Sequence, residues 1–393
     1  MKNNTTLFDT PKAITAAIIF SFIGNAVFMG MPMLVGALSD NLGFSAQQVG
    51  WLASADLGGM FASSILTSLL VARVNRRYLV ALGVVIAVLA NYAASLFHDF
   101  ETLFSLRVLA GFCSGICYAT GVASLAGSHN TGRNFSILMF ALVAINAIEL
   151  YSFPILSAHW GVNGIFLAFA GSFVLALCFI GWLPARAAEQ PLVVKGTKQA
   201  PAVPAYLPWL CLLAVACFYI TIGSYWSFIE RAGVDAGLSD SFIANVLTAG
   251  TICTLLGCFA ATALSTRLGQ SKPLIAALAG MTLTLLMLST GINALSYIAG
   301  TMLFNFMWLF TDIYQLGTLS NMDHSGRYVA LVPAAQGFAQ TLGPSMAGGM
   351  LAANMGYGSV MIMGALGSFA AFMLYLFVYS VLKRAAPAVA DAQ

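Results

Sequence analysis

The twenty residues "ARAAEQPLVVKGTKQAPAVP" at positions 185–204 are the longest polar interruption in an otherwise apolar chain. Proline, alanine and lysine together are typical of a linker rather than of a packed helix. Cutting the rest of the chain at its polar breaks gives six apolar segments before this stretch and six after it. We therefore predict two domains, residues 1–184 and 206–393, joined by a linker at 185–205. The predicted membrane spans are 13–38, 48–71, 78–97, 102–127, 135–157, 163–184, 206–230, 241–265, 273–292, 294–320, 328–353 and 357–382.

The composition identifies the kind of protein to which these segments belong. Of 393 residues, 60% are hydrophobic and only 7% are charged, with a mean hydropathy of +0.89, which excludes a water-soluble globular protein of this size. Runs of about twenty apolar residues suit membrane helices, whereas barrel strands alternate in polarity over roughly ten residues. We predict an all-α polytopic membrane protein. Its first span is too long for a signal peptide, and Thr10 and Pro11 predict the start of that helix.

Lysine and arginine positions predict the orientation of the spans. With the N-terminus inside, all but two of the sixteen basic residues lie on the cytoplasmic side; Arg231 lies outside and Arg107 lies within a span. We predict a multi-pass protein of a bacterial inner membrane with both termini cytoplasmic. The net charge of +3 reflects this loop bias and indicates no nucleic-acid partner.

Motifs for bond-making chemistry are missing from the sequence. The seven cysteines fall inside apolar segments without metal-ligand spacing, and we find no HExxH, GxSxG, P-loop or EF-hand pattern. We therefore predict neither an enzyme nor a bound metal or cofactor. An ion gradient is the expected source of energy.

Two similar strings indicate a duplication. "SLLVARVNRR" (68–77) follows the second predicted span and "TALSTRLGQSK" (262–272) follows the eighth, so that Arg73 aligns with Arg267 about half the chain later. Such internal repeats are common in transporter folds.

On these residues the chain resembles the major facilitator superfamily. Arg73, Arg76 and Arg77 match its signature G-x-L-A-D-R-x-G-R-R between spans two and three, although Ala72 replaces the acidic residue and Asn75 the second glycine. The resemblance implies two six-helix bundles related by a pseudo-two-fold axis along the membrane normal, and a monomer. It also implies a conformational gating role for four arginines: Arg73, Arg76, Arg77 and Arg267.

Two further segments bear on this resemblance. "RVLAGFCSG" matches the R-x-x-x-G feature of span four through Arg107, Gly111 and Gly115, and implies that Arg107 lies near the substrate and proton path. "INAIELYSFP" occupies the place of the antiporter signature G-P-x-x-G-G in span five. The direction of transport therefore stays open.

Ionisable residues inside the spans are the next candidates, because each costs about 2.5–3.5 kcal/mol at the bilayer centre. Glu149, Asp312 and Asp56 are predicted carriers of a coupled proton, since a carboxyl group in a low-dielectric site is readily reprotonated. A structural ion pair or packing hydrogen bond is the alternative for Asp312 and Arg107, and hydration from outside is the alternative for Asp56. Glu230 beside Arg231 is expected to form an interfacial pair.

Polar residues recur on single helix faces within several spans. In span ten, for example, Asn305, Trp308, Asp312 and Gln315 follow three- and four-residue steps. Such faces are expected to converge on a substrate site, although amides also tie helices together and aromatic side chains also fill cores. The substrate-binding candidates are Arg107, Asn25, Asn146, Tyr219, Trp226, Asn245, Asn305, Trp308, Gln315, Gln336 and Gln340.

These features predict a proton-coupled secondary active transporter. It would move a small organic solute, with aromatic and anionic solutes as the candidates, across the inner membrane by alternating access. Arg107 favours an organic acid, whereas the intramembrane acids favour efflux of drugs or metabolites by proton antiport. Sodium coupling, and a non-transporting receptor on the same fold, are further alternatives.

Overall fold

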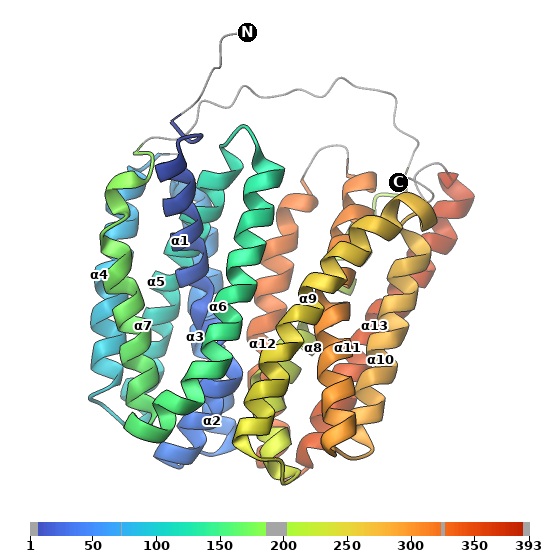
Figure 1. Ribbon diagram of the computed structural model, residues 1–393. Helices are drawn as coiled ribbons and strands as arrows, with labels where there is room; N and C mark the ends of the chain where they lie inside the picture. The colour runs from blue at the N-terminus through green and yellow to red at the C-terminus, as the bar shows by residue number, and fades with distance from the viewer. Residues whose placement is uncertain (1–6, 72, 186–202, 324–326, 388–393) are drawn as a thin grey trace. The chain divides into compact units, whose positions relative to one another are not determined.

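The computed structural model describes residues 7–71, 73–185, 203–323 and 327–387 (Figure 1). These residues form α-helices and two short 3-10 helices, without a β-strand in the described ranges. The helices of the first half are α1 Pro11–Met29, α2 Met31–Leu42, α3 Ala46–Leu70, α4 Arg76–Ala94, α5 Phe100–Ala126, α6 Thr131–Trp160, α7 Val162–Leu177 and η1 Ile180–Trp182. Those of the second half are α8 Leu207–Asp235, α9 Asp240–Leu268, α10 Ser271–Ser289, α11 Ala294–Met322, η2 Val329–Leu331, α12 Val332–Ala352 and α13 Gly356–Ala385.

The chain divides into two compact units, Met1–Val194 and Lys195–Gln393. In the first unit, α5 packs against α1, α3 and α4, and α7 covers α4. In the second unit, α8 packs against α12 and α13, while α11 packs against α9 and α10 against α13 (Figure 1). Each unit is therefore a helix bundle with its own core.

Ten of the described helices are long and apolar enough to cross a membrane: α1, α3, α4, α5, α6, α8, α9, α10, α11 and α13. The all-α polytopic class predicted from composition is confirmed. The sixth predicted span corresponds to α7, a shorter apolar helix of Val162–Leu177. The eleventh corresponds to α12, in which glutamines, glycines and Pro344 lower the hydropathy.

The first predicted span, 13–38, is not one continuous helix. The structure breaks it at Gly30, between α1 and α2. Pro32 has no N–H to donate to the carbonyl of Phe28, so one hydrogen bond of a continuous helix cannot form. A side chain at position 30 would overlap the ring of Phe153, which is why glycine suits the break. Thr10 caps α1 as predicted, accepting the backbone N–H of Ala13 at 3.2 Å.

Glycines bring the backbones of α3 and α5 into direct contact. A Cβ atom added to Gly111 would overlap the carbonyl of Asp56, and one added to Gly59 would overlap the carbonyl of Val108. A Cβ atom added to Gly115 would likewise overlap the carbonyl oxygen of Met60 and the hydroxyl oxygen of Ser63. Small residues permit such close approach in membrane bundles. The segment that resembles the span-four feature therefore also sets the spacing of these two helices.

Substituting Gly111 with alanine is expected to destabilise the first unit by roughly 1–3 kcal/mol, the usual cost of overpacking a close contact. Gly171→Ala in α7 is the matched control, because its Cβ would meet nothing within 4 Å. Thermal unfolding in detergent measures both variants. Equal melting temperatures for the two variants would contradict the proposed contact.

Candidate functional site

Arg107 of α5 forms a buried ion pair with Asp56 of α3 in the first unit. Its Nη1 lies 3.5 Å from Oδ2 of Asp56, and the two side chains are 0% and 2% exposed. Nη2 donates a hydrogen bond of 2.7 Å to Oδ1 of Asn91 in α4. The guanidinium also lies 4.9 Å from the ring centroid of Phe166 in α7. Arg107 of α5 therefore contacts residues of three other helices, α3, α4 and α7.

This arrangement bears on one alternative and adds two residues. The Asp56 side chain is 2% exposed and packs against α5, which argues against the alternative of hydration from outside. Asn91 and Phe166 were missed, although an asparagine in the apolar span 78–97 was a usable signal. Both Asp56 oxygens and two guanidinium nitrogens of Arg107 make no hydrogen bond within the described parts of the chain. The pair is thus an electrostatic contact that leaves hydrogen-bonding capacity unused.

Glu149 and Asn146 lie one turn apart on α6. They are 7% and 5% exposed, and both fall among the buried residues of that helix. Oε2 of Glu149 and Oδ1 of Asn146 have no hydrogen-bond partner among the described residues. A Cβ on Gly30 would lie 3.4 Å from Oε2 of Glu149, so the carboxyl group faces the break between α1 and α2. Buried polar atoms normally have a hydrogen-bond partner. The unsatisfied oxygens of Glu149 and Asn146 therefore mark a place where a proton or ligand would be stabilised.

Asp312 of α11 joins three helices in the second unit. The Tyr219 hydroxyl of α8 donates to its Oδ1 at 2.9 Å, and Nε2 of Gln336 in α12 donates to the same oxygen at 2.6 Å. One turn further along α11, Gln315 is buried, and both polar atoms of its side chain are unpaired in the described chain. Tyr375 of α13 lies within electrostatic range of Asp312, and its buried hydroxyl is likewise unpaired there. Asp312 therefore sits in a neutral polar cluster.

The tryptophans expected to contact substrate pack against other aromatic rings. Trp226 is fully buried, and its ring centroid lies 5.8 Å from that of Trp308. Phe304 lies 6.2 Å from Trp308 and stacks on Tyr225 at 3.8 Å. This arrangement agrees with the core alternative for Trp226, whose ring has no exposed surface.

The remaining amide candidates do not form one group. Asn305 donates to the carbonyl of Thr301 and accepts from Thr254 of α9 at 3.2 Å, so it ties two helices together. Asn245 is exposed on α9, and Asn25 is buried on α1. Gln340 is half-buried on α12, with Nε2 unpaired among the described residues. Hydrogen bonds join Tyr219, Asp312 and Gln336 of the predicted residues, in addition to the Arg107–Asp56 and Trp226–Trp308 contacts described above.

The arginines expected to act in gating differ in burial. Arg76 is buried, donates to the Ser124 hydroxyl at 3.0 Å and lies over the ring of Phe8. Arg77 donates to the carbonyl of Leu183 at 2.6 Å, and Arg73 is exposed. The side chain of Arg267, like Ala72, lies outside the described residues. Arg76 and Arg77 thus anchor the start of α4 within the first unit.

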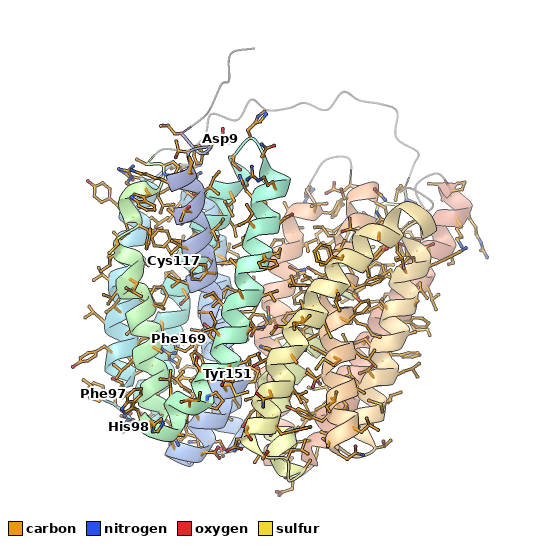
Figure 2. All side chains as sticks on the ribbon, viewed as in Figure 1. Asp9, Phe97, His98, Cys117, Tyr151 and Phe169 are labelled. Carbon is orange, nitrogen blue, oxygen red and sulfur yellow. The ribbon has the colours of Figure 1, made fainter. Side chains whose placement is uncertain are left out.

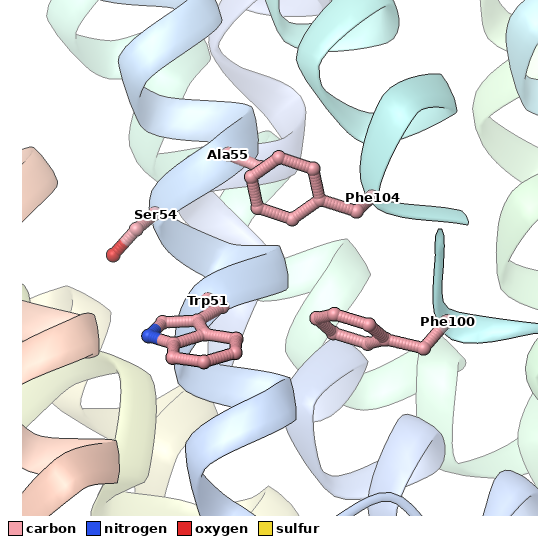
Figure 3. Close-up of a pocket in the computed structure, with 5 residues that line it drawn as sticks. All are labelled: Trp51, Ser54, Ala55, Phe100 and Phe104. Carbon is pink, nitrogen blue, oxygen red and sulfur yellow. The ribbon is translucent and has the colours of Figure 1, made fainter. Parts of the chain in front are cut away.

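An apolar cavity of about 460 Å³ lies between α3 and α5 (Figure 3). The residues that line it are Trp51, Ser54, Ala55, Phe100 and Phe104. None was predicted, because aromatic residues in a membrane segment ordinarily face lipid or the core. Within the described residues, no group of three or more histidine, cysteine, aspartate or glutamate side chains is placed to hold a metal ion.

Comparison with known proteins gives two results. The family model of the Major Facilitator Superfamily matches residues 16–344. Among solved structures, an aspartate-to-alanine variant of the nucleoside transporter NupG is similar, with a TM-score of 0.74, 11% identity and coverage of 93% of this chain and 99% of that one. The NupG structure without that substitution has a TM-score of 0.71, 13% identity and the same coverage. No curated protein sequence matches this chain.

Proposed function

The chain belongs to the Major Facilitator Superfamily, and we propose that it is a proton-coupled secondary transporter in which Glu149 and Asp312 carry the proton. One observation carries the proposal. Each unit holds a buried or half-buried intramembrane carboxyl group without an ion-pair partner among the described residues, whereas Asp56 pairs with Arg107. The protein would act as a monomer in a bacterial inner membrane, with both termini cytoplasmic, as its lysine and arginine distribution predicts.

The second unit supports an uncharged solute. Tyr219, Gln336, Gln315 and Gln340 offer hydroxyl and amide groups, and several of these atoms lack a partner in the described chain. Arg107, which favoured an anionic substrate, is fully buried in its pair with Asp56. A small neutral molecule with several hydrogen-bonding groups fits this chemistry best. Nucleosides are of that class, and the name of NupG makes them the first solutes to test.

Protonation of Asp312 would change how the second unit is held together. An ionised carboxylate accepts stronger hydrogen bonds than a neutral one, so protonation weakens the bonds from Tyr219 and Gln336. The contacts of α11 with α8 and α12 then differ between the two protonation states. A difference of this kind is what a proton needs to shift the populations of two conformations.

Protonation of Glu149 would act at the break in the first predicted span. A neutral carboxyl group gains an O–H donor, whereas the ionised group only accepts. The Oε2 atom of Glu149 lies near Gly30, where α1 and α2 are separated, and has no hydrogen-bond partner among the described residues. A proton on Glu149 therefore adds an O–H donor at the break between α1 and α2.

Solute-driven proton movement in liposomes tests the proposed function. Adding nucleosides to reconstituted protein is expected to change the internal pH, read with a trapped fluorescent dye. Glu149→Gln is expected to reduce this signal at least about tenfold, because glutamine keeps the shape and cannot take a proton. Asp240→Asn, at an exposed carboxylate, is the control and should retain the signal.

Two outcomes would contradict the proposal. A full proton signal from Glu149→Gln would remove Glu149 from the coupling mechanism. If the protein moved no solute across a panel of nucleosides, sugars, organic acids and organic cations, the receptor alternative would replace transport altogether.

A further inference from the structure

The cavity in the first unit is built as an aromatic cage. We use this name for Trp51, Phe100 and Phe104, with Ser54 and Ala55 completing the lining (Figure 3). The ring centroid of Phe100 lies 6.0 Å from those of Trp51 and Phe104, at interplanar angles of 45° and 43°. Trp51 is 41% exposed and Phe104 is 39% exposed. The rings thus line an open groove that a ligand of modest size can enter.

Helix contacts hold the cage in shape without a ligand. Trp51 and Ala55 are one turn apart on α3, and Phe100 and Phe104 are one turn apart on α5. The glycine-mediated backbone contact between α3 and α5 fixes the distance between the two pairs. Phe44 packs edge-on against Phe100, with centroids 6.0 Å apart and an interplanar angle of 89°. A preformed cage of this kind needs little ordering when a ligand binds.

The cage lies at an acidic end of the unit. Asp99 and Glu101 flank Phe100 in sequence, and Asp40 lies near the end of α2. Apart from Arg107, the described lysines and arginines of α1 to α6 lie in the first turns of α1, α4 and α6 or just before α4, at the opposite end: Lys12, Arg73, Arg76, Arg77 and Arg133. Figure 2 shows these two ends, with Asp9 at one and Phe97 and His98 at the other.

The acidic charge persists at neutral pH. Hydrogen bonds from the Thr102 side chain and backbone N–H hold the pKa of the Asp99 carboxyl below its usual range, so Asp99 stays ionised. The N-termini of α3 and α5 each contribute a positive end of about half a charge, which the two full charges of Asp99 and Glu101 exceed. Arg107, the nearest cation along α5, is paired with Asp56. The charged residues that flank Phe100 in sequence are therefore acidic, which favours a cation over an anion.

We propose that this cage binds a small organic cation that carries apolar groups, such as a quaternary ammonium compound. The faces of Trp51, Phe100 and Phe104 present negative π surfaces, and cations bind over such faces within about 6 Å of the ring centroid. The lining lacks a charged side chain and has only Ser54 as a polar residue, so the apolar groups of the ligand stay in contact with carbon. A neutral ring or a lipid acyl chain would contact the apolar lining but would gain no attraction from the nearby acidic residues. The lining includes none of the residues assigned above to proton coupling.

Comparing a cation with its neutral carbon isostere tests the proposal. Phenyltrimethylammonium and tert-butylbenzene have nearly the same shape and differ in charge. Binding of each to the full chain in a nonionic detergent is measured by saturation-transfer NMR and by calorimetry. The cation is expected to bind at least about tenfold more tightly than the isostere, and its affinity is expected to fall as salt rises.

Variants assign the binding to the cage. Trp51→Leu keeps an apolar side chain and removes the best π face, so it is expected to weaken cation binding about tenfold, whereas Trp51→Phe weakens it less. Glu101→Gln is expected to weaken it about twofold at low salt. Trp160→Leu is the matched control, since Trp160 is 66% exposed on α6 of the same unit and lies outside the cage.

Three results would overturn the proposal. The first is equal affinity for the cation and the isostere, which indicates a purely apolar groove. The second is unchanged cation affinity in Trp51→Leu and Glu101→Gln. The third is a co-purified lipid that the cation cannot displace, which makes the cage a lipid site. If Trp51→Leu fails to fold, Trp51→Phe and Glu101→Gln decide between these outcomes.

Discussion

Replacing Asp312 with asparagine is expected to abolish proton-driven accumulation of the solute while exchange of solute across the membrane continues. Asparagine retains an oxygen that accepts the hydrogen bonds from Tyr219 and Gln336, but it cannot take up a proton. A gradient of one pH unit sustains about a tenfold accumulation for one coupled proton, because one unit corresponds to about 1.36 kcal/mol. The accumulation ratio is therefore expected to fall from about ten to about one.

Reconstituted vesicles measure both activities of this variant. Accumulation is followed with an imposed pH gradient, and exchange is followed as counterflow of labelled solute without one. Asp235→Asn, at an exposed aspartate near the end of α8, is the control and should behave as the unsubstituted protein does. Retained accumulation in Asp312→Asn would show that Asp312 does not couple the proton. Loss of both activities with a normal melting temperature would place Asp312 in solute binding instead.

Much of the architecture was predictable because a bilayer imposes one length and one polarity on every span. Thr10 and Pro11 correctly marked the start of α1. The break at Gly30 was missed because the hydropathy of 13–38 is continuous, although the Pro32 that prevents a continuous helix is visible in the sequence. Hydropathy reports burial in lipid and carries no information about a single missing hydrogen bond.

The partners within the candidate sites were less predictable than the residues themselves. Helical spacing placed Asn305 and Asp312 on one face of α11, yet Asn305 is bonded to Thr254 and Asp312 to residues of α8 and α12. The choice of partner depends on how neighbouring helices rotate and cross, which one sequence does not encode in its periodicity. For the same reason, the sequence placed Arg107 inside the bundle and left open whether it would face a substrate or form a structural ion pair.

Replacing Arg107 with leucine is expected to destabilise the protein by about 3–5 kcal/mol. The substitution leaves the Asp56 carboxylate buried without its cation and removes the hydrogen bond to Asn91 and the contact with Phe166. Thermal unfolding in detergent measures this loss. Arg73→Leu is the matched control, because Arg73 is exposed and the variant should melt close to the unsubstituted protein.

A second substitution separates a structural pair from a substrate site. In Arg107→Leu with Asp56→Leu, no charge is left buried, and replacing a buried ion pair with apolar residues is often neutral or stabilising. We expect the double variant to recover most of the lost stability and to transport neutral solutes. If the double variant regains its melting temperature but binds no solute, Arg107 is instead part of the substrate site. The ion pair therefore stabilises the first unit and also bears on the chemical class of the solute. A guanidinium held by Asp56 is not available to bind an anionic solute.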